Sequence, residues 1–167
     1  MIVVEQRLSD LFNRLPDLID ANNKPFKPVY HFGDGIEANE FIKRYKHAVY
    51  PLIYQTSLRE TQNYRERTVD TTLEIVLCVQ TRTDLLNSER WATTYKTMLV
   101  PLMENIMILF EKGGIIVSNF EYEIEKFPNY SQTESKDANA FIDIVDALRF
   151  RLPCEINDKC ITKNIKF

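Results

Sequence analysis

The sequence predicts an α+β fold: a four-stranded, mostly antiparallel sheet with a long helix and an N-terminal helix packed on one face. One observation is the alternation in residues 71–82, where every odd position from 73 to 79 is apolar, as in a strand with one buried face. The other is a change to helical spacing after a polar turn at 83–88. The apolar positions of this helix are Trp91, Tyr95, Met98, Leu102, Ile106 and Leu109.

The long helix is expected to begin near Ser88, a good capping residue, and to end at Gly113-Gly114, where glycine accepts a left-handed conformation. Pro101 is expected to kink or break it, because proline lacks an amide donor. Most of the helix circumference is apolar and needs cover from more than one side. Either the N-terminal helix or a neighbouring subunit is expected to cover the flank around Leu99, Met103 and Met107.

A single domain is expected over residues 1–167, since 44% of the chain is hydrophobic and can form a core. The 21 basic and 24 acidic residues are mixed along the chain and argue against a broad basic face for nucleic acid. Three cysteines and no signal-peptide pattern indicate a reducing cytosol. The most apolar run, 98–110, is shorter than the roughly 20 residues that cross a bilayer, so no membrane partner is expected.

In the N-terminal half, residues 2–15 have the apolar stripe of an amphipathic helix that ends at Pro16. Residues 20–28, with two asparagines and two prolines, are predicted to form a loop. Asp34 and Glu37 match a capping box and predict a short helix that reaches about residue 46.

A short strand is predicted at 49–54, at a sheet edge or beginning near Pro51, because proline cannot donate a ladder hydrogen bond. Residues 55–70 form a polar arm between this strand and the next. The arm is either a solvated loop with balanced charges or an interaction element, since connections of this length are uncommon without a use. Its basic candidates for contacts with a subunit or partner are Arg59, Arg65 and Arg67.

In the C-terminal half, residues 115–127 are predicted to form a strand with one acidic face, and 148–156 a strand carrying arginines. If the two strands pair, opposite charges would face each other and help to fix the register. Residues 128–136 are expected to form a loop, 137–145 a short helix and 157–167 a frayed tail. The charged residues of the two strands are also candidates for subunit contacts: Glu121, Glu123, Glu125, Arg149 and Arg151.

No residue pattern carries an unambiguous catalytic signature. His31, Asp34, Glu37 and Glu40 lie close together in sequence and leave open a small metal-dependent hydrolase or nuclease, although their spacing matches no ligand motif. The cysteines are expected to pack as small hydrophobic residues. The mismatched spacing predicts no bound metal, and with only four glycines and no phosphate-binding loop no nucleotide cofactor is expected.

The order of segments resembles the tail terminators and related neck-completion proteins of long-tailed bacteriophages. The likeness covers about residues 2–156 and includes the stretch 31–35, Tyr50-Pro51-Leu52-Ile53, the polar arm, the strand at 71–82 and the closing segment 143–152.

The resemblance implies a structural virion protein without enzyme activity. Such a subunit assembles in the host cytoplasm into a ring, typically a hexamer, that caps the tail tube at the tail-neck junction. Its partners would be copies of itself, the tail tube protein and a neck or head connector protein, with DNA only passing through the lumen. Another neck, head-completion or tail subunit of the virion is the alternative.

Overall fold

A computed structural model describes residues 1–20, 23–45, 49–56, 59–130 and 142–167. The α+β prediction is confirmed, and three helices are present in these described parts. They are α1 (Val4–Phe12), α2 (Gly35–Tyr45) and one continuous helix over 87–113, made of α3 (Asn87–Arg90), the π-helical η2 (Trp91–Leu99) and α4 (Val100–Gly113).

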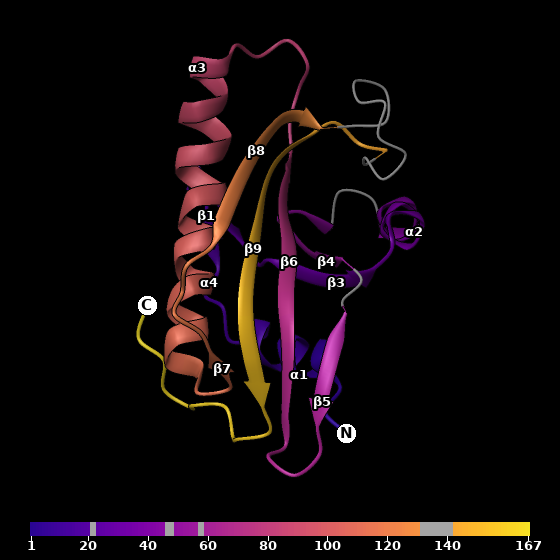
Figure 1. Cartoon of the computed structure of the whole chain (residues 1–167). Coiled ribbons are helices and arrows are strands. Elements are labelled where there is room, and N and C mark those ends of the chain that lie inside the picture. Colours follow the sequence, from indigo (N-terminus) through magenta and orange to yellow (C-terminus); the bar gives the residue numbers. More distant parts are fainter. Residues whose placement is uncertain (21–22, 46–48, 57–58, 131–141) are drawn as a thin grey trace.

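The main sheet has seven strands where four were predicted, and it is curled into a half-barrel beside the long helix (Figure 1). The path β3-β4-β6-β9-β7 is extended by β5, which pairs with β6, and by β8, which pairs with β9. The strands are β3 (Val29–Gly33), β4 (Leu52–Thr56), β5 (Glu60–Asn63), β6 (Thr68–Gln80), β7 (Ile116–Val117), β8 (Glu123–Tyr130) and β9 (Val145–Asn157).

The predicted central strand is β6, which pairs with β9 along its whole length, from Thr68 opposite Asn157 to Gln80 opposite Val145. Its odd residues face the long helix and are buried in the main core. The even side was expected to tolerate water, but Val76 and Cys78 are also buried. The reason is that α2 covers this end of the sheet from the opposite face, around a second apolar cluster.

The long helix begins at Asn87 and ends with Gly114 in the left-handed region at φ 80°, as the glycine pair predicts. No break occurs at Pro101, since the helix runs without interruption over residues 87–113; Pro101 lies in the first turn of α4, and a π-helical stretch ends two residues before it. In this stretch the hydroxyls of Thr93, Thr94 and Thr97 donate to the carbonyls four residues earlier. Such bonds bend helices and offer those carbonyls other partners.

Helix α1 packs on the long helix and the sheet. The Phe12 ring lies 5.8 Å from that of Phe110. A Cβ on Gly113 would lie 2.7 Å from a methyl of Leu11, so the two helices approach closely where there is no side chain. Leu99 and Met103 are buried in the same core. Leu99 and Met103 of the predicted second flank are therefore covered within the chain, while Met107 is only partly buried against the same core.

Strand β3 is parallel to β4, and α2 connects the two, so the sheet is mixed. The capping box is confirmed, since one Asp34 carboxylate oxygen accepts from the amides of Ile36 and Glu37, and Glu37 accepts from the Asp34 amide. Pro51 lies at the start of β4, after a cis peptide bond, but β4 itself is an inner strand. In the predicted loop 20–28, Pro25–Phe26 forms β2 and pairs with β1 (Leu18–Ile19).

The strand predicted over 115–127 is interrupted. β7 and β8 are separated by a turn in which Phe120 has φ 58° and donates its amide to the Ser118 hydroxyl. Strand β8 then continues to Tyr130, into the predicted loop. The helix predicted over 137–145 lies partly outside the described residues, and its last residue, Val145, begins β9.

Residues 157–167 are held more firmly than a frayed tail. The Thr162 amide donates to the Gly113 carbonyl at 3.0 Å, and Arg14 donates to the Thr162 carbonyl at 2.8 Å. Ile161 and Ile165 pack against the main core. The tail thus covers the C-terminal end of the long helix.

Candidate functional site

The charged residues predicted to face each other do so on the outer face of the sheet. Strand β8 pairs with β9 in the register that places Glu123 opposite Arg151 and Glu125 opposite Arg149. Arg149 donates to the Glu125 carboxylate, and Arg151 lies 3.9 Å from that of Glu123. The cross-strand charge pairing is confirmed.

Glu74 on β6 joins this ladder, although it was not among the predicted contact residues. The Arg151 Nε donates to its carboxylate at 2.6 Å, and Arg149 lies 3.8 Å from the same group. This carboxylate raises the pKa of the Arg151 guanidinium further. Because each arginine lies between two carboxylates, the ladder connects three strands. Its members are partly exposed, so each pair contributes about 0–1 kcal/mol and mainly supports the register.

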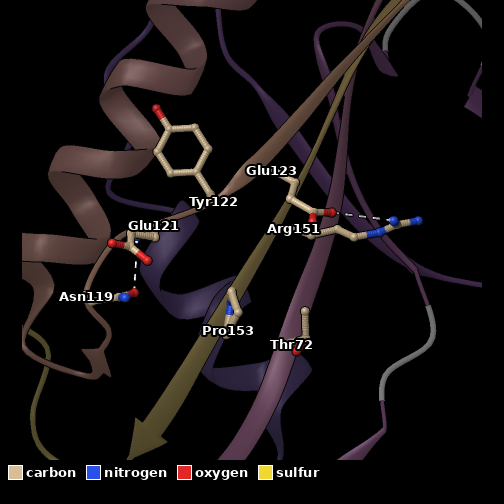
Figure 2. Close-up of a pocket in the computed structure, with 7 residues that line it drawn as sticks. All are labelled: Thr72, Asn119, Glu121, Tyr122, Glu123, Arg151 and Pro153. Atoms are coloured by element: carbon tan, nitrogen blue, oxygen red, sulfur yellow. Dashed lines mark hydrogen bonds and ion pairs between the residues drawn. The ribbon is translucent and has the colours of Figure 1, made fainter.

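A hollow of about 460 Å³ opens beside the ladder, between the turn after β7 and strands β6 and β9. Figure 2 shows Glu121 and Asn119 on one side of it, Glu123 and Arg151 on the other, and Thr72 and Pro153 below. The Glu121 amide donates to the Asn119 side chain at 3.2 Å, so the turn supports its own geometry. Tyr122 extends from the turn toward the long helix and is 43% exposed.

The hollow is open, its lining is more apolar than polar, and the charged side chains that border it form no catalytic arrangement. The carboxylates that border it outnumber the arginine, and that arginine is already paired with Glu74. Glu121 precedes β8 and forms no ion pair with the rest of the described chain. This surface can therefore accept positively charged groups, and Glu121 is its most available acid.

The predicted polar arm is a β-hairpin, because Glu60–Asn63 pairs with Thr68–Thr71. Arg67 lies in its turn at φ 54° and pairs with Asp158 at 3.2 Å. Arg59 and Arg65 are exposed and form no ion pair within the described residues. Among the predicted basic residues, these two are free to meet a partner, while Arg67, Arg149 and Arg151 have intrachain partners.

A buried ion pair was missed by sequence reasoning. Arg90, 2% exposed, donates to Asp146, 0% exposed, at 2.7 Å. Thr94 donates to the same carboxylate at 2.6 Å and the Asn129 amide at 3.2 Å, so the buried acid has several donors. The available signal was an aspartate between the apolar residues Val145 and Ala147, a position that requires a buried partner. The network joins the start of the long helix to β8 and β9.

The residues considered for a hydrolase are separated by their structural roles. Asp34 and Glu37 cap α2, Glu40 pairs with Lys43 at 2.7 Å, and the His31 ring stacks on Phe41 with centroids 4.2 Å apart. Over the part of the chain that the structure describes, no three His, Cys, Asp or Glu residues converge in a way that could hold a metal ion.

The cysteines differ in their surroundings. Cys78 and Cys154 are buried, and desolvation raises the pKa of the Cys78 thiol well above its usual value and that of Cys154 to about 12. Cys160, in the tail, is exposed. The buried thiols are therefore poor nucleophiles, because the thiolate is the reactive form.

No family model matches the sequence, and no curated protein is similar enough to count as a relative. Within the described residues, no helix combines the length and apolar character needed to cross a membrane. Any function for this chain therefore rests on its own surfaces and on the resemblance described above.

Proposed function

We propose that this chain is a structural virion protein, the tail terminator of a long-tailed bacteriophage, which forms a hexameric ring on the tail tube and joins it to the neck or head connector. The proposal rests on the resemblance in segment order and on one structural observation. The curled sheet is open, and basic side chains at one side and an acid at the other form no ion pair within the described residues, although the basic side also carries the exposed acids Glu60 and Glu66.

On one side the β5–β6 hairpin carries Arg59 and Arg65, and on the other the turn before β8 carries Glu121. Two different surfaces of one subunit that complement each other make a head-to-tail contact, and a head-to-tail contact closes into a ring when the rotation allows it. The exposed Tyr64 at the hairpin tip and the half-exposed Tyr122 and Ile124 beside Glu121 add apolar area. Such a mixed surface is typical of protein interfaces.

The intrachain ion pairs reduce the number of predicted contact residues whose charges remain available to a neighbouring subunit. Arg149, Arg151, Glu123 and Glu125 remain near the proposed interface, but their charges are largely used within the ladder. They would shape the surface, while Glu121 and the hairpin arginines would supply the charges that act between subunits.

Native mass spectrometry and analytical ultracentrifugation at high protein concentration test the ring. The wild-type chain is expected to form a closed oligomer, and the Arg59→Glu, Arg65→Glu variant is expected to dissociate it. Adding Glu121→Lys to that variant should restore assembly, because the hairpin is then acidic and the turn before β8 is basic, so the two surfaces attract each other again. Lys27→Glu, which changes an exposed charge away from both surfaces, is the matched control.

A terminator that assembles only on its tube would be monomeric alone, so purified particles are the stronger test. Immunogold labelling at the tail-neck junction is expected. A monomer in solution that is also absent from purified virions would contradict the proposal. Labelling at another position would instead identify a different neck, head-completion or tail subunit.

A further inference from the structure

A second hollow, of about 360 Å³, lies between β3 and α2. Strand β3 is at the opposite edge of the sheet from the β8 turn. Helix α2 stands beside β3 and β4, away from the long helix (Figure 1). Neither the ladder nor the β5–β6 hairpin lines it. The ring proposed above makes no use of this hollow.

Four rings form a continuous row along the hollow. The centroid of His31 lies 6.2 Å from Phe32 and 4.2 Å from Phe41, and Phe41 lies 4.9 Å from Tyr45. The two outer rings are open to solvent, with Phe32 47% and Tyr45 52% exposed. Aromatic faces carry partial negative charge and attract cations that approach within about 6 Å.

Acidic groups stand beside these rings. Glu37 and Glu40 both line the hollow and lie three residues apart on one face of α2. Glu40 is paired with Lys43 at 2.7 Å, whereas Glu37 forms no ion pair within the described residues. Burial lowers the pKa of His31, so its imidazole is neutral at pH 7 and does not repel a cation. Arg44 is the one basic residue that lines the hollow, and it has no ion pair within the described part of the chain.

We propose that this hollow binds an organic cation, an alkylammonium or guanidinium group, against its row of aromatic rings and next to the carboxylates of Glu37 and Glu40, the second of which is shared with Lys43. The group can belong to a free small molecule or to a lysine or arginine side chain. The rings supply the cation–π contact and the carboxylates supply charge, while Arg44 opposes the ligand and weakens its binding. The rings and carboxylates are expected to strengthen cation binding and Arg44 to weaken it, so substitutions of the two kinds should change the affinity in opposite directions.

Amide chemical-shift titration of the full chain is the test, with three probes: choline, acetyl-Gly-Lys-Gly-amide, and acetyl-Gly-norleucine-Gly-amide as the uncharged counterpart. Shifts confined to β3 and α2 are expected for the cations and not for the norleucine peptide. Saturation by choline would identify a free cation, and preference for the lysine peptide a side chain.

Variants then check the assignment. Tyr45→Ala and Glu40→Gln are expected to weaken binding about two- to five-fold each, the range of an exposed cation–π contact. Arg44→Gln is expected to strengthen it. Tyr64→Ala removes an exposed tyrosine elsewhere and is expected to leave binding unchanged.

Far-UV circular dichroism of each variant shows whether α2 is retained. Three results would each overturn the proposal. They are equal binding of the norleucine peptide, weaker cation binding in Arg44→Gln, and no chemical-shift change with any cation at about 10 mM, a concentration that would detect the dissociation constant of a weak surface site.

Discussion

Arg90 and Asp146 form an ion pair that is almost completely removed from solvent, with their side chains 2.7 Å apart. The guanidinium also donates to the carbonyls of Leu85 and Arg82 and to the Thr81 hydroxyl. One pair therefore fixes the loop that leads from β6 into the long helix. It also attaches the helix start to β9, the strand that carries the arginines of the ladder.

Removing one member of this pair leaves the other charge buried and unpaired. Arg90→Met or Asp146→Asn is expected to lower the free energy of unfolding by about 3–5 kcal/mol. The double variant Arg90→Met, Asp146→Leu should lose less than the sum of the two. Urea unfolding followed by circular dichroism measures each value, and a loss below about 1 kcal/mol in both single variants would contradict the assigned role.

The ion pairs of the surface ladder should contribute much less to stability than the buried Arg90–Asp146 pair. Glu125→Gln removes one partner of a solvent-screened pair, so a change of about 0–1 kcal/mol is expected, and it should shrink further in high salt. Urea unfolding in low and high sodium chloride measures the change in the free energy of unfolding and its dependence on salt. Glu111 is an exposed acid on the long helix that forms no ion pair within the described residues, and Glu111→Gln is the control. A loss comparable to that of the buried pair would mean that the ladder is a core element.

The end of the long helix depends on backbone conformation. Gly114 has φ 80°, where a side chain is strained, although a Cβ there would meet no atom closer than 3.4 Å. Gly114→Ala is therefore expected to lower the free energy of unfolding by about 1–2 kcal/mol through strain alone. Gly114→Asn should recover part of this loss, because asparagine tolerates the left-handed region better. Equal stability of the alanine variant and the wild type would show that the helix ends in another way.

The thiols should react in two classes. Cys160 is exposed, whereas burial raises the pKa of Cys78 and Cys154. With Ellman's reagent at pH 8, one thiol per native chain is expected to react quickly, and all three in urea. Cys160→Ser should abolish the fast phase. A fast phase that remains in this variant would mean that a buried cysteine becomes accessible in the native state.

Local pattern was enough to predict several elements. The amphipathic spacing of residues 2–15 predicted α1, the alternation around Leu73 and Ile75 predicted β6, and Asp34 with Glu37 predicted the cap of α2. The cross-strand charge register of β8 and β9 was also readable, because alternation places Glu123 and Arg151 on one face once the strands pair. Each of these signals lies within a few residues of chain.

The missed elements depend on contacts between distant segments. Strand β3, with its aromatic residues, histidine and glycine, has no clean alternation, and it forms by pairing with β4 across a helix. Val76 and Cys78 became core residues because α2 folds over them, and Glu74 joined the ladder because β6 is the other neighbour of β9. The same holds for the candidate sites. The row of rings forms because α2 brings Phe41 and Tyr45 to His31 and Phe32, and the carboxylates that contact Arg151 come from two other strands.

The sequence by itself determined helix α1, the start of α2, strand β6, the long helix and its end, and the alternating charges along the last strands. These properties follow from side-chain spacing and from the backbone preferences of glycine and proline. Only the tertiary structure decided which charged residues form ion pairs within the chain and which remain available to a partner. Strand order and helix docking, which bring Arg90 to Asp146 and leave Arg59, Arg65 and Glu121 unpaired, arise from packing over the whole fold.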